Sequence, residues 1–328
     1  MNAQGNSTAD DGLLTIAIPT YNRCKELSQL LEWIDTYAPL EVKVVVRDNA
    51  STDGTWEMLQ NWKKKTKRDA AIFRNPENLG IDYNILKVAE DCTTEWFWWM
   101  GDDDLFDPDV PVNLISKIQK TNSDLIILNY KAWTNDLKKP VSDAVFESNK
   151  NCIKTKYDVL MIIAELFSFI SILAVRVKPF KKEKITIPDW FIRTNIDFVY
   201  VVFNIIKNCK PEFLEYSFIR YRTGNENRGF DWNDLWIPYS SALNYCLPDL
   251  PKVVRRQIYR KALTRSIIPK LRNHKICSKF GIIEGIKFII RYFNLFYGFK
   301  DFWFKFVVIS LFPNWIYRDL KNNLNNER

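Results

Sequence analysis

The sequence predicts an α/β fold with a mainly parallel central sheet, followed by a C-terminal helical extension. Three observations support this prediction. Short apolar runs alternate with segments of helical periodicity over the first 130 residues, polar residues cluster directly after three of these runs, and basic and aromatic residues accumulate near the C-terminus. Alternating strands and helices at this spacing are typical of a parallel sheet covered by helices.

The elements of the first half follow from short patterns. A strand is predicted over 13–18, where an apolar run ends at Pro19, and a helix over 25–37. Further strands are predicted over 42–48, 70–74, 95–100 and 123–130, and further helices over 51–65 and 80–92. Such sheets bind ligands beyond the carboxyl ends of their strands. The polar clusters after the first, second and fourth strands are therefore expected to meet at one edge.

The rest of the chain is expected to be less regular up to about residue 228 and helical after it. The apolar stretch 157–177 is interrupted by Asp158 and Glu165, which favours a core helix followed by a strand over a membrane span. A strand leading into a polar turn is predicted over 212–229. Residues 1–12 are polar and lack the apolar core of a signal peptide, so a disordered lead is expected.

The composition limits the chemistry that the chain can perform. Its six cysteines are far apart and form no CxxC pair, which argues against a zinc site and favours reduced thiols in the cytosol. His274 is the only histidine, so a histidine-based triad and a multi-histidine metal site are excluded. Any metal must be bound by carboxylates, which are ligands typical of Mg²⁺ or Mn²⁺.

Four motifs follow one another along the first half: TIAIPTYNR, VVVRDNASTDGT, NPENLGIDYN and WWMGDDDLFDP. Together they resemble the nucleotide-sugar-binding half of inverting family 2 glycosyltransferases with the Rossmann-like GT-A fold, in particular the O-antigen and abequosyltransferase-like members. The resemblance is close over 13–130 and loose over 131–228. It implies a GT-A domain over 13–228, with a donor-binding half (13–130) and an acceptor half (131–228), and leaves 229–328 as a helical C-terminal region.

The resemblance also implies a set of donor-binding residues. The base and ribose of a nucleotide sugar would lie against the first two motifs, and a glycine and an asparagine would border the donor pocket. Carried over by position, these residues are Pro19, Thr20, Asn22, Arg23, Asp48, Gly80 and Asn84. Asp48 ends its strand, so its carboxylate could accept a hydrogen bond from the base. For residues 48–54 the alternative is a capped turn with an Asx bend.

Asp102, Asp103 and Asp104 follow a nearly continuous aromatic run, and adjacent carboxylates repel one another unless a cation joins them. A divalent cation, Mn²⁺ or Mg²⁺, would bridge them to the donor diphosphate and stabilise the leaving group. The family often has an acid where this chain has Gly101. The resemblance therefore implies Asp104 as the principal metal ligand, Asp103 as a contact of ribose or metal, and Asp102 as a substitute for the displaced acid. A solvated acidic turn is the alternative.

An inverting transfer needs a base that deprotonates the acceptor hydroxyl, and without a usable histidine this base is Asp or Glu. The family places it in the acceptor half near the start of a helix, which points to Asp197, with Asp189 as the second candidate. The alternative for each is an ordinary helix cap. Arg222 and Arg228 could reach the diphosphate, or could be arginines of a surface loop.

The C-terminal end has a strong positive charge. From residue 251 onward it holds 17 basic and 4 acidic residues, a net charge of +13, whereas the first 250 residues hold 30 basic and 35 acidic. Its aromatic-rich segment 281–321 has no uncharged run long enough to cross a bilayer. Such a segment is typical of binding to an anionic membrane surface. The enzyme is therefore expected in the cytoplasm, peripheral on the inner face of the membrane, with a glycan or lipid-linked acceptor. The alternative is a helical subdomain that packs on the protein.

Two other functions fit the sequence less well. A nucleic-acid-binding protein could use the basic end, but no recognised nucleic-acid motif is present and the aromatics lie on helical apolar stripes, so no nucleic acid is expected as a partner. A nucleotidyltransferase acting on sugar phosphates would need a triphosphate loop rich in glycine and basic residues after the first strand. The sequence PTYNR does not supply one.

Overall fold

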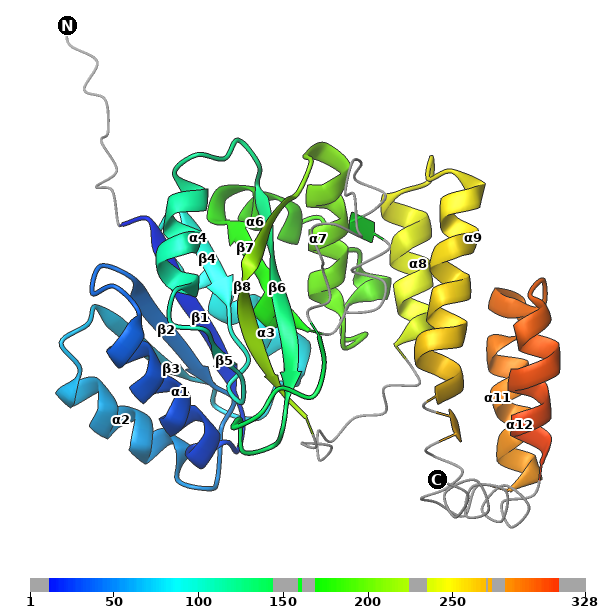
Figure 1. Ribbon diagram of the computed structural model, residues 1–328, viewed down its shortest axis with the longest axis horizontal. Coiled ribbons are helices and arrows are strands. Elements are labelled where there is room, and N and C mark those ends of the chain that lie inside the picture. Colours follow the sequence, from blue (N-terminus) through cyan, green and yellow to red (C-terminus); the bar gives the residue numbers. More distant parts are fainter. Residues whose placement is uncertain are drawn as a thin grey trace, which may run out of the picture. The chain divides into compact units, whose positions relative to one another are not determined.

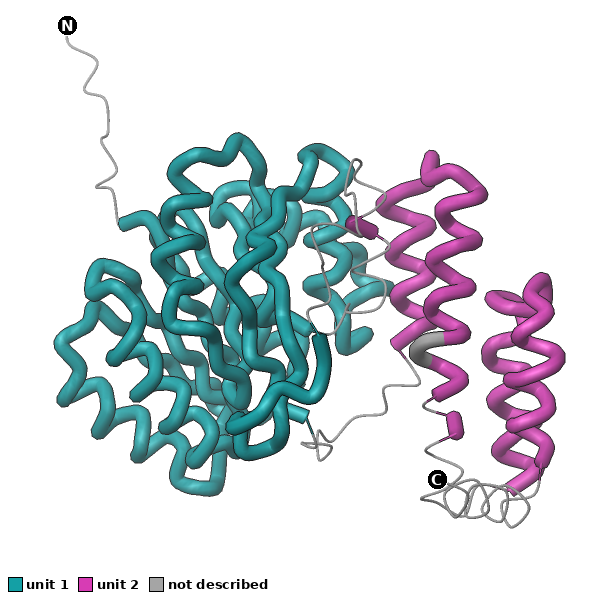
Figure 2. The backbone as a smooth tube through the Cα atoms, viewed as in Figure 1, with its two compact units in different colours: residues 1–156, 168–230 teal, residues 157–167, 231–328 magenta. Residues whose placement is uncertain are grey.

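The computed structural model describes residues 12–143, 159–160, 169–223, 235–269, 271–272 and 281–312. The chain divides into two compact units, drawn in different colours in Figure 2. Unit 1 comprises Met1–Lys156 and Ser168–Phe230, and unit 2 comprises Tyr157–Phe167 and Asp231–Arg328. Arg228, one of the two arginines predicted to reach the diphosphate, lies outside the described residues.

Unit 1 is built around one eight-stranded sheet with the order β3-β2-β1-β4-β7-β6-β8-β5 (Figure 1). Its strands are β1 (Leu14–Thr20), β2 (Lys43–Asp48), β3 (Ala70–Arg74), β4 (Trp96–Trp99), β5 (Leu105–Phe106), β6 (Leu125–Trp133), β7 (Leu173–Arg176) and β8 (Glu212–Arg222). The strands β3, β2, β1 and β4 are parallel, and β6 is parallel to β8. β7 is antiparallel to both of its neighbours, and β5 is antiparallel to β8. The predicted α/β fold with a mainly parallel sheet is confirmed.

Two groups of helices cover this sheet (Figure 1). α1 and α2 pack together, and α3 packs with α6 and α7. Because β2 and β3 extend the sheet on one side of β1 while β4 lies on the other, right-handed crossovers place α3 on the face opposite to α1 and α2. The helical elements are α1 (Cys24–Tyr37), α2 (Thr55–Lys65), α3 (Ile81–Glu90), α4 (Val110–Ile118), α6 (Val177–Lys184) and α7 (Asp197–Asn208), with the 3₁₀ turns η1 (Ile170–Ile172) and η2 (Asp189–Phe191).

The aromatic run before the aspartates is the central strand β4. All four of its residues, Trp96 to Trp99, are fully buried, as expected for a parallel strand covered on both faces. After β4 the chain passes through Met100–Asp104 and re-enters the sheet at β5, where Leu105 pairs with Arg220 of β8. The acidic segment is therefore held in the sheet at both of its ends.

Unit 2 is helical in its described parts. It contains α8 (Trp236–Cys246), α9 (Lys252–Lys261), α11 (Ile282–Phe296) and α12 (Val308–Leu311), with π-helical turns at η4 (Ala262–Ile267) and η5 (Phe302–Val307). Within the described ranges, no helix combines the length and apolar character needed to cross a bilayer. The helix predicted within 157–177 lies mostly outside those ranges, and the strand predicted after it is β7.

Candidate active site

The polar residues after β1, β2 and β4 lie at one edge of the sheet, because these strands are parallel neighbours. The loops bond to one another: the Thr20 hydroxyl donates to Asp102 Oδ2 over 2.8 Å, and the Asn22 amide donates to Ser51 Oγ over 2.8 Å. Pro19 precedes this edge within β1, opposite Arg47 of β2. The order of connection reverses between β1 and β4, the position at which α/β sheets bind ligands.

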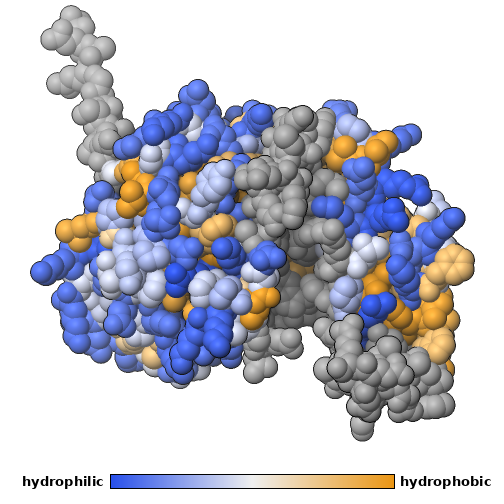
Figure 3. Space-filling view, in the orientation of Figure 1, coloured by the Kyte–Doolittle hydropathy of each residue, from blue (hydrophilic) through white to orange (hydrophobic). Residues whose placement is uncertain are grey.

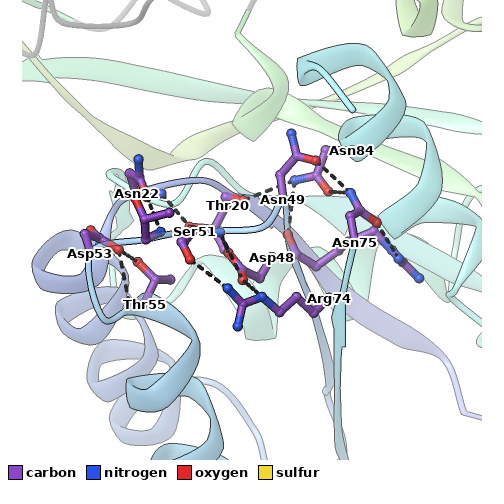
Figure 4. A network of polar contacts seen from close by, with 12 residues as sticks. Thr20, Asn22, Asp48, Asn49, Ser51, Asp53, Thr55, Arg74, Asn75 and Asn84 are labelled. Carbon is purple, nitrogen blue, oxygen red and sulfur yellow. Dashed lines mark hydrogen bonds and ion pairs between the residues drawn. The ribbon is translucent and has the colours of Figure 1, made fainter. Parts of the chain in front are cut away.

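The turn after β2 is organised by Asp48. Both oxygens of this fully buried carboxylate accept the Ser51 amide, at 3.1 and 3.3 Å. Arg74 at the end of β3 pairs with Asp48 over 3.2 Å, and its Nη2 donates to the Ser51 carbonyl over 2.7 Å (Figure 4). The capped turn is therefore present. In this arrangement Asp48 orders the loop, and a base edge would have to share its carboxylate with Arg74.

The turn after β1 docks onto the start of α2. Asn22 adopts a left-handed backbone, with φ of 52°, and its Oδ1 accepts the Thr52 amide over 2.8 Å. The Arg23 amide donates to Thr55 Oγ1 over 3.2 Å, and Arg23 is the residue directly before α1. These bonds fix the backbone of the predicted donor residues Asn22 and Arg23.

A row of asparagines joins the third motif to the first two strands (Figure 4). Asn49 Oδ1 accepts from Asn75 Nδ2 over 2.8 Å, and Asn75 Nδ2 also donates to Asn84 Oδ1 over 3.1 Å. Asn84 in turn donates to the carbonyls of Thr20 and Arg47, at 3.3 and 3.1 Å. Asn84 is therefore a buried brace between β1, β2 and α3. Asn49 and Asn75 were missed as site residues, although both lie inside the quoted motifs.

Gly80 is the residue before α3 and has a φ of 90°, a backbone conformation that favours glycine. Its carbonyl accepts from Asn49 Nδ2 over 3.2 Å. A Cβ at this position would meet nothing within 4 Å, so the space beside Gly80 is open. The position of Gly80 at the border of a donor pocket stays a prediction.

The three aspartates have different surroundings. Burial, followed by the charge of Asp103, raises the pKa of Asp102 to about 7, while the Thr20 hydroxyl and the Arg23 charge act in the opposite direction. Asp103 and Asp104 are buried. Asp104 Oδ2 accepts from Ser171 Oγ over 2.7 Å, and its Oδ1 accepts the Arg222 amide over 3.2 Å. The carboxylate of Asp104 is thereby held in one orientation.

Gly101 is the position at which the resembling family often has an acid, and its surroundings explain the glycine. Its amide donates to Ser171 Oγ over 2.9 Å. A Cβ on Gly101 would lie 3.0 Å from Asp104 Oδ2 and 3.1 Å from Ser171 Oγ. A larger residue would therefore push against the pair that orients Asp104. Ser171 was not identified from the sequence, because it lies 67 residues from Asp104 in the chain.

Arg222 joins β8 to the acidic segment through its backbone and its side chain. Its Nε donates to the Asp103 carbonyl over 2.7 Å, and its two terminal nitrogens donate to the Asn135 carbonyl at 2.5 Å and Gln29 Oε1 at 2.8 Å. Through these bonds the guanidinium of Arg222 holds the acidic loop in place. A diphosphate that binds Arg222 would have to do so alongside these three partners.

The two candidate bases lie in different environments. Asp197 is the first residue of α7 and is buried; its carboxylate accepts from the amides of Arg193 and Thr194, at 2.9 and 3.0 Å, and from Thr194 Oγ1 at 2.9 Å. Asp189 is exposed in η2, next to Trp190, whose side chain is also exposed. Asp197 thus has an oriented carboxylate and Asp189 an accessible one.

The donor set of the acidic segment fits a hard divalent cation. Asp103 and Asp104 offer carboxylate oxygens, which Mg²⁺ and Mn²⁺ prefer as ligands. Among the described residues, no three Asp, Glu, His or Cys side chains converge as a metal cage. Mg²⁺ is commonly bound by one or two carboxylates together with substrate phosphates.

Sequence comparisons identify relatives of this chain. Residues 15–172 match the family described as glycosyl transferase family 2. Abequosyltransferase RfbV of Salmonella typhimurium is 26% identical over 232 residues, which are 66% of this chain and 68% of that protein. Dolichol-phosphate mannosyltransferase of Pyrococcus furiosus is 30% identical over 115 residues, 35% of this chain and 32% of that protein.

Solved structures share the fold. S. aureus TarS 1-349 in complex with UDP-GlcNAc matches with a TM-score of 0.60 and 14% identity, over 91% of this chain and 90% of that chain. Mannosyltransferase PcManGT from Pyrobaculum calidifontis, in complex with GDP-Man and Mn²⁺, matches with a TM-score of 0.52 and 14% identity, over 95% of this chain and 87% of that chain. At these identities the likeness concerns the fold, which is GT-A. Together with the match of residues 15–172 and the similarity to named glycosyltransferases, it identifies this chain as a glycosyltransferase whose first half is similar to family 2.

Proposed function

We propose that this glycosyltransferase moves a sugar, with inversion, from a nucleoside-diphosphate sugar to a glycan or lipid-linked acceptor in bacterial surface polysaccharide synthesis. The similarity to an abequosyltransferase over 66% of the chain supports this context, and the fold shared with a TarS complex of UDP-GlcNAc supports a UDP-sugar as the donor. The observation that carries the proposal is the bond from Thr20 to Asp102, which ties the loop after β1 to the acidic segment after β4.

The donor is proposed to lie across this edge of the sheet. Its base and ribose would contact the loops after β1 and β2, and its diphosphate would face the acidic segment after β4. The protein residues proposed to border it are Pro19, Thr20, Asn22, Arg23, Asp48, Gly80, Asn84, Asp102 and Asp103, with Arg222 next to the diphosphate and Arg228 as a further candidate. A parallel sheet with a connection reversal at this point provides the crevice that such ligands occupy.

Asp104 and Asp103 are the residues that would hold Mn²⁺ or Mg²⁺. When bound, the ion would supply positive charge to the diphosphate as it leaves. The protein's own part is to orient the acidic segment: Ser171 and Arg222 bond to Asp104, and Thr20 bonds to Asp102.

The transfer step needs one base. The acceptor oxygen forms a bond to C1 of the sugar on the face opposite the diphosphate, the bond from C1 to the diphosphate oxygen breaks, and the hydroxyl proton passes to a carboxylate. Asp197 is proposed for this role, because three hydrogen bonds from Arg193 and Thr194 fix the orientation of its carboxylate. Asp189 is the second candidate, because it is exposed beside Trp190.

Unit 2 is proposed to bind the inner face of the membrane through α11. One stripe of this helix, Gly285, Tyr292 and Phe296, is buried, whereas a second apolar stripe is exposed and contains Ile282, Ile283, Ile286, Ile290 and Phe293. Lys287 and Arg291 are exposed on the same helix. Figure 3 shows hydrophobic residues gathered on the surface of this region. An exposed apolar stripe next to basic residues is suited to an anionic lipid surface.

The proposal is tested by a thermal-shift screen of nucleotide sugars with and without Mn²⁺. A ligand that binds the folded state raises its melting temperature. We expect a UDP-sugar to raise it, and Mn²⁺ to increase the shift in the wild-type protein but not in Asp104→Ala. Asp69→Ala, which removes an exposed carboxylate paired with Lys43, is the matched control and should behave as wild type. Equal Mn²⁺ effects in Asp104→Ala and wild type would refute the metal assignment.

A further inference from the structure

Asp82 is a buried carboxyl group near the start of α3 that the proposed donor site does not use. Its side chain is 4% exposed, and within the described residues its Oδ2 has no hydrogen-bond partner. Its Oδ1 accepts the backbone amide of Asp197, the first residue of α7, over 3.0 Å. An ionised carboxylate in such a place is costly unless a cation or several donors compensate for its burial.

Asp197 has the opposite environment. Its oxygens accept three bonds from Arg193 and Thr194, and the loop that provides them has left-handed backbone at Arg193 (φ 68°) and Asn195 (φ 65°). Both aspartates therefore belong to the junction of α3 and α7, where Asp197 accepts three bonds and only Oδ1 of Asp82 accepts one from the Asp197 amide. Neighbouring buried carboxylates disfavour charge on each other.

Among the described residues, the salt bridges and hydrogen bonds of the basic side chains on β2 and α6 lead to other partners than this pair. From β2, Arg47 donates to Asp91 and Asn75, and Asp48 pairs with Arg74. From α6, Lys184 pairs with Glu90 and Lys181 donates to the Cys92 carbonyl, both near the other end of α3. β1 contributes the carbonyl of Thr20. The charged group that acts on Asp82 is the Asp197 carboxylate.

We propose that Asp82 and Asp197 share one proton, with Asp82 protonated and Asp197 ionised, and that Asp82 is the positioning residue of the Asp197 carboxylate. Burial, followed by the Asp197 charge and the side-chain contact with Asp197, raises the pKa of Asp82 to about 9, in agreement with this arrangement. In other buried carboxyl pairs, the two groups likewise share one proton because both cannot be ionised at the same time. The positioning role of Asp82 rests on the proposal that Asp197 is the base. The sharing of one proton by the two carboxyl groups does not depend on that proposal.

The arrangement has a function in the transfer step. A protonated Asp82 can donate to Asp197, which keeps the Asp197 carboxylate ionised and oriented at neutral pH. Loss of the shared proton would leave two buried carboxylates in contact, and their repulsion would act directly on the junction of α3 and α7. The position of Asp197 therefore depends on the protonation of Asp82.

The test is a carboxyl ¹³C NMR titration of aspartate-labelled full-length protein without ligand, in wild type, Asp82→Asn, Asp197→Asn and Asp69→Asn. We expect one aspartate signal of the wild type to stay protonated at pH 7 and to titrate at alkaline pH. Asp82→Asn should remove this signal, Asp69→Asn should keep it, and Asp197→Asn should move its titration to lower pH by at least about one unit, since the neighbouring charge is gone. If no signal removed by Asp82→Asn titrates above pH 6, the shared proton is refuted.

Thermal melts between pH 5 and pH 9 provide a second measurement. A carboxyl with a raised pKa binds its proton in the folded state and not in the unfolded state, where its pKa is about 3.9, so its contribution to stability falls as pH rises from about 4 to the folded pKa. Asp82→Asn should therefore flatten the fall in melting temperature, and Asp69→Asn should not. Equal slopes in Asp82→Asn and wild type would contradict the proposal. If Asp197→Asn keeps full transfer while the NMR result holds, the base assignment fails and the pair stands.

Discussion

The Ser171 hydroxyl lies 2.7 Å from Asp104 Oδ2 and 2.9 Å from the Gly101 amide, so it donates to the carboxylate and accepts from the segment that carries it. Ser171 is itself fixed, because its carbonyl accepts the indole N–H of Trp98 over 2.7 Å. A fully buried serine between β4 and the acidic segment thus holds the proposed metal ligand in one rotamer. Groups that bond to a ligating side chain commonly set its orientation and its basicity.

We predict that Ser171→Ala weakens Mn²⁺ binding by about 10- to 100-fold, the range expected for loss of a residue that orients a metal ligand. The measurement is a Mn²⁺ titration of the thermal shift caused by a saturating nucleotide sugar. Ser240→Ala, which removes another buried hydroxyl in α8 of unit 2, is the control and should leave the titration unchanged. The prediction fails if both variants need the same Mn²⁺ concentration as wild type.

The assignment of the base to Asp197 or to Asp189 predicts opposite effects of the two Asp→Asn substitutions on the transfer rate. If Asp197 is the base, Asp197→Asn should lower the rate of sugar transfer by at least about 100-fold, the usual contribution of a general base, while donor binding is retained. Asp189→Asn should then transfer at a rate near that of wild type. Product formation is measured by mass spectrometry, and donor binding by thermal shift. Unchanged transfer in Asp197→Asn would move the assignment to Asp189.

The edge of the sheet at which the proposed site lies could be predicted from the sequence. The alternation of strands and helices and the polar motifs after the strands are patterns of residues close together in the chain. The same holds for α1, whose buried residues Leu27, Leu30, Leu31 and Ile34 show helical spacing in the sequence. The position of β7 between β4 and β6 has no such local signal. It depends on pairing between β4 and a strand more than 70 residues later.

The side-chain partners of the site residues could likewise not be predicted from local sequence patterns. Asp48 looks accessible at the end of its strand, yet Arg74 and the Ser51 amide occupy its carboxylate. Arg222 looks like a loop arginine, yet it holds the carbonyl of Asp103. Both results come from side chains of distant strands meeting in the sheet, which a single sequence does not specify.

The exposed stripe of α11 predicts membrane binding that depends on two isoleucines. Ile283 and Ile290 are 67% and 69% exposed, and burying such a side chain in lipid is worth about 1.5–3 kcal/mol. Replacing both with Asp should lower partitioning onto vesicles that contain phosphatidylserine by at least about tenfold. Cosedimentation measures this. Val253→Asp is the matched control, since Val253 of α9 is 69% exposed. Equal binding of the double variant and the control would exclude this stripe as the lipid contact.

The close contact between α11 and α12 predicts a reversal of the usual effect of replacing glycine with alanine. In a helix interior this change normally stabilises by about 1 kcal/mol. At Gly285, however, a Cβ would lie 2.0 Å from the Ser310 carbonyl oxygen, so the helices must move apart and we expect destabilisation by about 1–3 kcal/mol. Gly298→Ala is the control, because a Cβ there meets nothing within 4 Å. Hydrogen exchange of the α11 amides measures the effect: it should accelerate in Gly285→Ala alone, and slower exchange in that variant would show that the two helices do not pack through this glycine.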